Sequence, residues 1–217
     1  MENNIFISTS CRYGKLVHPQ PYHHYIHHTH NTQEFIQYIE YIKGELEIPS
    51  HLQSKVFRSQ HLKSRNNQPL IDIDRGRLLQ EYTRSNTVIV EICSVKIYEL
   101  DGFNLHHLAV DGGDGGIESQ NYQGNFRIQA DQELHDDLKA IKQIAHDKRL
   151  IVATHINPRK FPKRSLLINT LSRYCQGLKI DFHDASKIIG AKDVTDVNHL
   201  NKKGHRIQAQ TLHRILR

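Results

Sequence analysis

The chain has 217 residues, of which 37% are hydrophobic and 24% are charged, and its formal net charge is +6. That length suits a single domain over residues 1–217 with a substantial core, and no stretch approaches the roughly 18 apolar residues of a membrane helix. The basic clusters at 55–65 and 159–164 do not alternate with aromatic residues and match no nucleic-acid-binding signature, so solvated helix faces explain the charge better than a nucleic-acid partner.

Short β-type runs alternate with helical patterns along the chain. Strands are predicted at residues 4–7, 55–58, 87–93, 149–154 and 178–182, and helices at 32–43, 131–146, 164–174 and 202–216. The run at 87–93 is β-branched almost throughout, which is typical of a central strand buried on both faces. Thr32 is the predicted N-cap of the helix at 32–43, and Gly177 is the predicted stop of the helix that starts at 164.

This alternation predicts an α/β fold, a flavodoxin-like three-layer sandwich around a five-stranded parallel sheet. Two stretches fall outside the pattern: a His-rich segment at 17–30 and a long Gly-rich excursion at 100–129. Loops of such length tend to be functional or mobile. Because ligands of doubly wound sheets bind beyond the carboxyl ends of the strands, we expect the reactive residues directly after strands.

The first predicted strand is followed by a polar turn, Ser8-Thr9-Ser10-Cys11-Arg12-Tyr13-Gly14. A serine at a strand-to-helix turn can present its hydroxyl to a substrate while nearby backbone N–H groups face a developing oxyanion. Serine is also common in ordinary turns, so this segment alone does not distinguish a nucleophile from a helix cap. Cys11 competes with Ser10, because a thiolate is intrinsically the better nucleophile.

Just before the last predicted helix, Asp196 and His199 stand three residues apart. At this spacing a short loop can aim both side chains at one place. His199 could take a proton from a serine hydroxyl, and Asp196 could orient the imidazole and stabilise its charged form. A loop aspartate beside a hydrogen-bonded structural histidine is the alternative interpretation.

The two ends together resemble the SGNH (GDSL-type) hydrolases, as a divergent member. Ser8 to Gly14 lies on that family's Gly-Asp-Ser-Leu-Thr-x-Gly turn, with Ser10 at the nucleophile and Gly14 at the closing glycine. Asp196-Val197-Asn198-His199-Leu200-Asn201-x-x-Gly204-His205 is similar to a typical family ending. The resemblance implies an SGNH hydrolase fold and a catalytic triad of Ser10, His199 and Asp196.

The chain departs from the family at the oxyanion hole. Ser8 and Thr9 replace Gly and Asp in the opening motif, and Cys93-Ser94-Val95-Lys96 stands where the family has Gly-x-Asn-Asp. The backbone N–H of Ser10 or Cys11, aided by Ser94 or Lys96, would then stabilise the oxyanion. His155 follows the fourth predicted strand and could contact substrate, or could cap the helix region near Arg164.

We predict no cofactor and no metal. His27 or His28 with Glu34 could assemble a zinc site, but no spacing in the His-rich segment is a known ligand pattern. The run from Asp111 to Gly116 lacks the ligand spacing and the closing glutamate of an EF-hand.

The function predicted from these residues is an ester hydrolase (acyl esterase) acting on a small-molecule or glycan ester. The alternatives are an acyltransferase that uses the same residues and a binding protein on the hydrolase fold. No membrane partner is expected, and the sequence does not reveal the substrate or the oligomeric state. Three cysteines without zinc spacing, and an N-terminus unlike a signal peptide, predict reduced thiols in a cytoplasmic protein.

Overall fold

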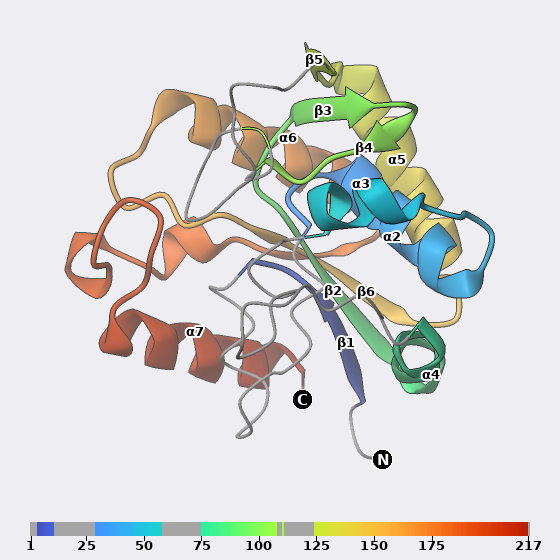
Figure 1. Ribbon diagram of the computed structural model, residues 1–217. Coiled ribbons are helices and arrows are strands. Elements are labelled where there is room, and N and C mark those ends of the chain that lie inside the picture. The colour runs from blue at the N-terminus through green and yellow to red at the C-terminus, as the bar shows by residue number, and fades with distance from the viewer. Residues whose placement is uncertain (1–3, 11–28, 58–74, 108–109, 111–123, 217) are drawn as a thin grey trace, which may run out of the picture.

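The protein is built around a parallel β-sheet, shown in the computed structural model of Figure 1. The structure describes residues 4–10, 29–57, 75–107, 110 and 124–216. Its main sheet has four strands in the order β1 (Ile5–Ser8), β2 (Thr87–Ile92), β6 (Arg149–Thr154) and β7 (Asp181–His183), all parallel. The mixed α/β class predicted from the sequence is confirmed for these residues.

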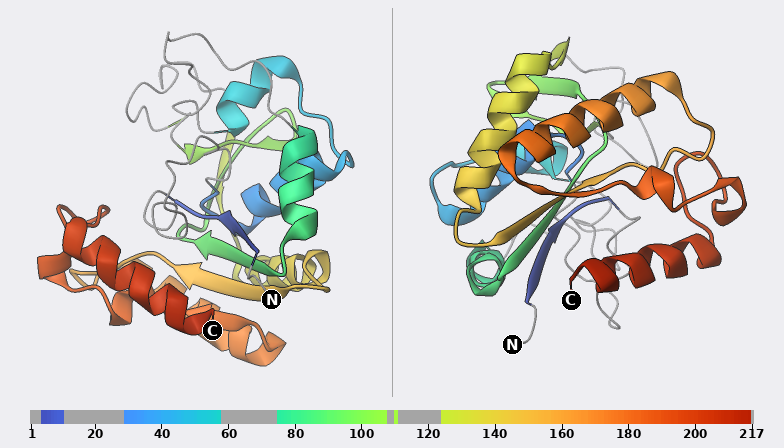
Figure 2. Two further views of the ribbon diagram at one scale, coloured as in Figure 1. Left: turned by 90° about the horizontal axis from the view of Figure 1, so that it is seen from below. Right: turned by 180° about the vertical axis from the view of Figure 1, so that it is seen from behind.

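Helices cover both faces of this sheet, which makes three layers (Figure 1; Figure 2, right). Side chains alternate along β2, so Val88, Val90 and Ile92 join one core and Ile89 joins the other. The first core is packed by α2 (Thr32–Lys43), α4 (Arg75–Arg84), α5 (Asp131–Ile144) and α6 (Pro162–Leu178). The second core is packed by α7 (Lys202–Ile215) and the segment before it, which contains the short 3-10 turns η5 (Ala185–Lys187) and η6 (Ala191–Asp193). All six residues of β2 are buried, as expected of a central strand.

The prediction of a strand at 55–58 is wrong. Lys55 and Val56 belong to a helix, α3 (Ser50–Val56). Leu52 and Val56 are four residues apart and both buried, so the apolar spacing follows one helix face rather than a strand. Four parallel strands, not five, are therefore found in the described part of the chain.

Helix ends also differ from the sequence prediction. Asn31, not Thr32, is the N-cap of α2, and its side chain accepts a hydrogen bond from the Glu34 N–H. The helix ends at Gly44, which has a φ of +83°, a left-handed conformation that glycine adopts without strain. Helix α6 continues through Gly177 to Leu178, and β7 consequently starts at Asp181, later than the predicted residue 178.

The predicted excursion at 100–129 contains strands that the sequence analysis missed. Together with β3 (Lys96–Leu100), β4 (Phe103–Asn104) and β5 (Asn125–Ile128) form a second, antiparallel sheet in the order β4-β3-β5. Strand β5 alternates polar and apolar residues over only four positions, and its apolar residues Phe126 and Ile128 are both exposed, so the pattern is too short to distinguish a strand from a loop. Helix α4 was missed as well.

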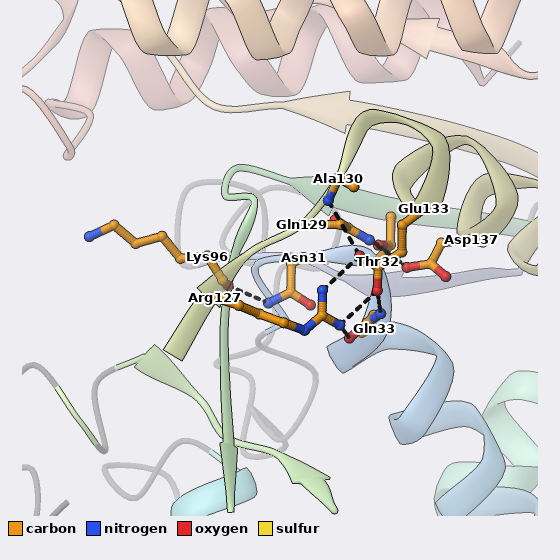
Figure 3. A network of polar contacts seen from close by, with 9 residues as sticks. All are labelled: Asn31, Thr32, Gln33, Lys96, Arg127, Gln129, Ala130, Glu133 and Asp137. Carbon is orange, nitrogen blue, oxygen red and sulfur yellow. Dashed lines mark hydrogen bonds and ion pairs between the residues drawn. The ribbon is translucent and has the colours of Figure 1, made fainter. Parts of the chain in front are cut away.

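A polar network attaches the small sheet to the helices (Figure 3). The Arg127 guanidinium donates to both carboxylate oxygens of Glu133 at 2.6 and 2.7 Å and to Gln33 at 3.1 Å. The Gln129 amide donates to Thr32 and to Asp137 at 2.8 and 2.6 Å. These bonds join β5 and the residue after it to the first turn of α2 and the first two turns of α5.

The prediction of a single domain over 1–217 stays a prediction. Among the described helices, none combines the length and the apolar character needed to cross a bilayer.

Candidate functional site

Polar residues gather where the parallel strands end. Ser10 follows β1, Ser94 follows β2, His155 follows β6, and the loop with Asp196 and His199 lies between β7 and α7. Because the four strands run in the same direction, their carboxyl ends share one edge of the sheet. Ser10, Ser94 and His155 therefore follow strands at this edge, whereas Lys96 is the first residue of β3.

The turn after β1 is held by two buried hydrogen bonds. The hydroxyl groups of Ser8 and Thr29 are 2.8 Å apart, and the Ser10 N–H donates to Glu91 Oε2 at 2.8 Å. Ser10 is only 3% exposed, and its own Oγ makes no hydrogen bond with the described residues. Its hydroxyl is thus available for another partner, whereas its backbone N–H, the donor expected at an oxyanion, is occupied by a carboxyl group.

Asp196 and His199 form the pair that their spacing predicts. The His199 Nδ1 lies 2.7 Å from Asp196 Oδ2 and 2.9 Å from Oδ1, and Asp196 Oδ1 also accepts the N–H groups of Asn198 and His199. The Asn198 N–H, and after it the His199 ring, hold the pKa of Asp196 below its ordinary value. An ionised carboxylate only accepts hydrogen bonds, so Nδ1 carries the proton and Nε2 is left as the basic nitrogen.

The loop that carries this pair is tied down on three sides. Val194 and Leu200 form an antiparallel bridge, and the Asn201 side chain caps α7 by accepting the Gly204 N–H at 2.9 Å. Gly204 packs so closely that a Cβ atom there would collide with the carbonyl group of Asp193. Gly204 therefore has a steric role: only a glycine lets α7 pack this closely against the segment before the loop.

Arg164 is the third residue that holds the loop in place. Its guanidinium donates to the carbonyl groups of Ile156 at 3.1 Å and Val197 at 2.9 Å, and to Asn198 Oδ1 at 2.6 Å. A solvated surface charge is expected here from the sequence, but Arg164 is half-buried and links the segment after β6 to the Asp196–His199 loop. Nothing in its local sequence distinguishes it from its basic neighbours.

Ser94 and Lys96 take different positions after β2. Ser94 is half-buried, and its Oγ accepts the Lys96 N–H at 3.0 Å, which leaves the hydroxyl hydrogen able to donate. Lys96 is exposed; its carbonyl group accepts from the Asn31 amide at 3.1 Å, and its side chain extends away from the polar network in Figure 3. The N–H groups of Cys93 and Ser94 both donate to the His30 carbonyl group, at 2.9 and 3.0 Å, so they are already engaged.

His155 directly follows β6 and is buried, with 8% of its surface exposed. Its Nδ1 lies 2.6 Å from the carbonyl oxygen of Ile156. Cys11 lies outside the described residues. Within those residues, no hydrogen bond joins Ser10 to Asp196 or to His199, and Ser10 is buried whereas the two loop side chains are more than half exposed. The structure thus pairs the acid with the base but does not pair the base with the serine.

Two buried polar groups near this edge were missed from the sequence. Glu91 is fully buried and holds the Ser10 turn, and a carboxyl group in an otherwise apolar strand was the signal that could have identified it. The strand registers place Glu91 beside Ala153 and Ala153 beside His183. Burial lowers the pKa of His183, although Gln208 and the charges of Asp184 and Glu91 oppose that shift.

A second group of side chains could hold a metal ion: His30, His106 and His107. Glu34 lies next to it, with Oε2 accepting the His30 N–H at 2.9 Å and standing 3.8 Å from the His30 ring nitrogen Nδ1. Burial raises the pKa of Glu34 to about 8, and hydrogen bonds from His30 and Asn31 only partly offset that rise. His27 and His28, the histidines considered from the sequence, lie outside the described residues.

The described residues form a mixed α/β fold with a group of polar side chains at the carboxyl ends of the parallel strands. Residues 14–111 match the family described as the TviD N-terminal domain, which is less than half of the chain. The match includes strand β2, Ser94, Lys96 and the three clustered histidines, but not Ser10, His155 or the Asp196–His199 pair. No curated protein sequence is similar enough to this chain to count as a match.

Two solved structures are similar at low levels. One is the periplasmic domain of the lipopolysaccharide acetyltransferase of Salmonella ser. Paratyphi A, at 14% identity and a TM-score of 0.37, covering 71% of this chain and 66% of that one. The other is an active-site mutant of a family two carbohydrate esterase from Clostridium thermocellum in complex with celluohexase, at 10% identity and a TM-score of 0.36, covering 61% and 35%. This chain thus aligns with less than two thirds of either structure, and TM-scores below 0.5 do not establish a shared fold.

Proposed function

We propose that this protein is an SGNH-like serine esterase in which Ser10 is the nucleophile, His199 the general base and Asp196 the residue that orients His199. The observation that supports this most is the Asp196–His199 pair, whose 2.7 Å contact through Nδ1 leaves Nε2 as the basic nitrogen. The buried Ser10 hydroxyl, which makes no hydrogen bond with described residues, follows a strand on the same edge.

In the proposed reaction, Ser10 Oγ attacks the carbonyl carbon of an ester as His199 Nε2 takes the hydroxyl proton. The tetrahedral intermediate collapses to an acyl-enzyme, and His199 gives the proton to the departing alcohol. Water then attacks the acyl group, again with His199 as base, and releases the acid and the free serine. For the first step, Nε2 has to come within about 2.6–3.2 Å of Ser10 Oγ when substrate is bound.

The oxyanion would be stabilised by donors that remain open. Ser94 is the first candidate, since its hydroxyl accepts from Lys96 N–H but can still donate. Lys96 would have to turn its exposed side chain toward the edge, and Cys11 and His155 are further candidate contacts. A donor placed at an oxyanion contributes about 100- to 1000-fold in kcat, so Ser94→Ala should reduce turnover by that order.

The direct test is hydrolysis of short p-nitrophenyl esters by Ser10→Ala. We expect turnover to fall to background while the far-ultraviolet circular dichroism spectrum and Tm stay close to those of the parent protein. Ser8→Ala is the matched control, since Ser8 is an equally buried serine two residues earlier whose hydroxyl is bonded to Thr29. Full activity in Ser10→Ala together with loss in Cys11→Ala would move the nucleophile to Cys11.

An acyltransferase is the second candidate function, because a polar hydroxyl compound can attack the same acyl-enzyme in place of water. Incubation with an acyl donor and candidate glycan acceptors, followed by mass spectrometry, separates the two: acylated acceptor means transfer, and free acid alone means hydrolysis. A binding protein on a hydrolase fold is the alternative if neither product forms.

We also propose a cytoplasmic location. Cys175 is a free, buried cysteine in the structure, which suits a reducing compartment. Fractionation of expressing cells tests the location: recovery in the cytosolic fraction is expected, and recovery in a secreted or extracytoplasmic fraction would overturn it.

A further inference from the structure

Three histidines from distant parts of the sequence meet beside α2. One ring nitrogen from each of His30, His106 and His107 lies within 4.8 Å of the others. The ring centroids are 4.5 Å apart for His30 and His106, 4.0 Å for His30 and His107, and 4.6 Å for His106 and His107. His106 is buried and the other two are half-buried, so the cluster is largely shielded from solvent.

Backbone contacts fix all three residues. The His30 carbonyl group accepts the N–H groups of Cys93 and Ser94 at the end of β2. The His106 N–H donates to the carbonyl group of Lys55 in α3 at 3.0 Å, and the His107 carbonyl group accepts the Val110 N–H at 3.0 Å. The imidazoles are therefore carried by backbone that is held in place by β2 and α3, rather than by one loop alone.

We propose that His30, His106 and His107 bind a divalent transition-metal ion of the zinc class. Imidazole nitrogens suit Zn²⁺, Co²⁺, Ni²⁺ and Cu²⁺. With Zn–N bonds of about 2.0–2.1 Å, nitrogens of a tetrahedral site stand about 3.4 Å apart, so small ring rotations would close the present spacing onto an ion. Three protein ligands leave a fourth position for water or a substrate oxygen.

Glu34 supports the assignment. Its carboxyl group lies 3.8 Å from the His30 ring and accepts the His30 N–H, and the Asn31 amide donates to its other oxygen at 2.8 Å. Carboxyl groups next to a metal-binding histidine commonly orient its ring. The arrangement thus has ligands and an outer group that can align one of them.

Zinc affinity of the full chain is the test, measured by competition with a chromophoric chelator after removal of bound metal. We expect one tight equivalent of Zn²⁺ per chain. His107→Gln should weaken that binding by at least about 100-fold, more than the loss of an outer-shell partner. The exposed histidines His146 and His213 provide matched controls, and His146→Gln with His213→Gln should leave the affinity unchanged.

The His-rich segment needs its own control, because its histidines could bind metal independently. A variant with His18, His23, His24, His27 and His28 replaced by Asn should retain the tight equivalent. The proposal is overturned if no tight equivalent binds, or if it survives His107→Gln and disappears in the segment variant.

A measurement without substitutions covers the case in which His107→Gln does not fold. Zn²⁺ should protect His106 and His107 from modification by diethyl pyrocarbonate, as mapped by mass spectrometry, and should raise Tm by about 5–10 °C at 100 times the Kd. Unchanged modification of both residues by saturating Zn²⁺ contradicts the site. Neither readout uses ester turnover, so the result is separate from that of the proposed esterase.

Discussion

The loop with Asp196 and His199 and the turn with Ser10 belong to the same edge of the sheet, but their surroundings are opposite. The loop side chains are 53% and 58% exposed and are organised by bonds within four consecutive residues. Ser10 is 3% exposed, and its turn depends on Glu91, 81 residues further along the chain. Changes to the exposed side chains of Asp196 and His199 should therefore affect chemistry alone, whereas loss of the Glu91 contact at the turn should affect chemistry and stability together.

The largest expected effect is the loss of activity in His199→Ala. Removal of the general base should reduce kcat for p-nitrophenyl esters by about 1000-fold or more. Because the side chain is exposed, the free energy of unfolding should change by no more than about 0.5 kcal/mol. Kinetics and urea unfolding measured side by side, with His213→Ala as the exposed-histidine control, test both halves; a large loss of stability would remove the contrast between loop and turn.

Glu91→Ala, unlike His199→Ala, should lower both stability and activity. It leaves the buried N–H of Ser10 without its acceptor, which costs about 1–3 kcal/mol of unfolding free energy, and it should also lower esterase turnover because the turn loses its anchor. Glu91→Gln keeps an acceptor of the same size and should recover most of the stability. Equal stability of Glu91→Ala and the parent protein in urea unfolding would show that the bond does not hold the turn.

Gly204→Ala should disturb the packing of α7 against the loop that carries Asp196 and His199, and so lower stability. The added methyl group would collide with the Asp193 carbonyl group, and such overpacking costs about 1–3 kcal/mol. Gly177→Ala is the matched control, because a Cβ there meets nothing within 4 Å and α6 should tolerate or gain from alanine. If both variants have the same Tm, the close packing of α7 on η6 is not required.

The smallest effect is expected for the pH dependence contributed by His183. Burial lowers its folded pKa below the ordinary 6.5, so the unfolded chain binds the proton more readily. Its contribution to stability is complete above the unfolded pKa and is lost as the pH falls through 6.5 toward the folded pKa. Urea midpoints at pH 7.5 and 5.5 should drop more for the parent protein than for His183→Gln; an equal drop would contradict this.

Local patterns in the sequence were enough for much of the fold. The observed bounds of α2 and β6 are the predicted ones. The burial of β2 was predicted from its β-branched composition. The failures have physical reasons. Leu52 and Val56 fit a short helix as well as a strand, and the alternation of Phe126 and Ile128 in β5 covers only four exposed residues, too few to indicate a strand.

The same division holds for the candidate site. The Asp196–His199 contact lies within one loop, so spacing alone predicted it. The bond from Ser10 to Glu91 and the meeting of His30 with His106 and His107 depend on how distant segments pack, which no local spacing encodes. Arg164 was missed for the same reason, since its partners at 197 and 198 are more than 30 residues away.

Covalent labelling by a fluorophosphonate probe tests the central claim most directly, because the probe reacts with a serine only when a base activates its hydroxyl. After digestion, mass spectrometry should find the adduct on Ser10 in the folded protein, and labelling should disappear in His199→Ala and after unfolding in urea. An adduct on another residue, or no adduct on a folded protein, would contradict the assignment of Ser10 and His199 as nucleophile and base.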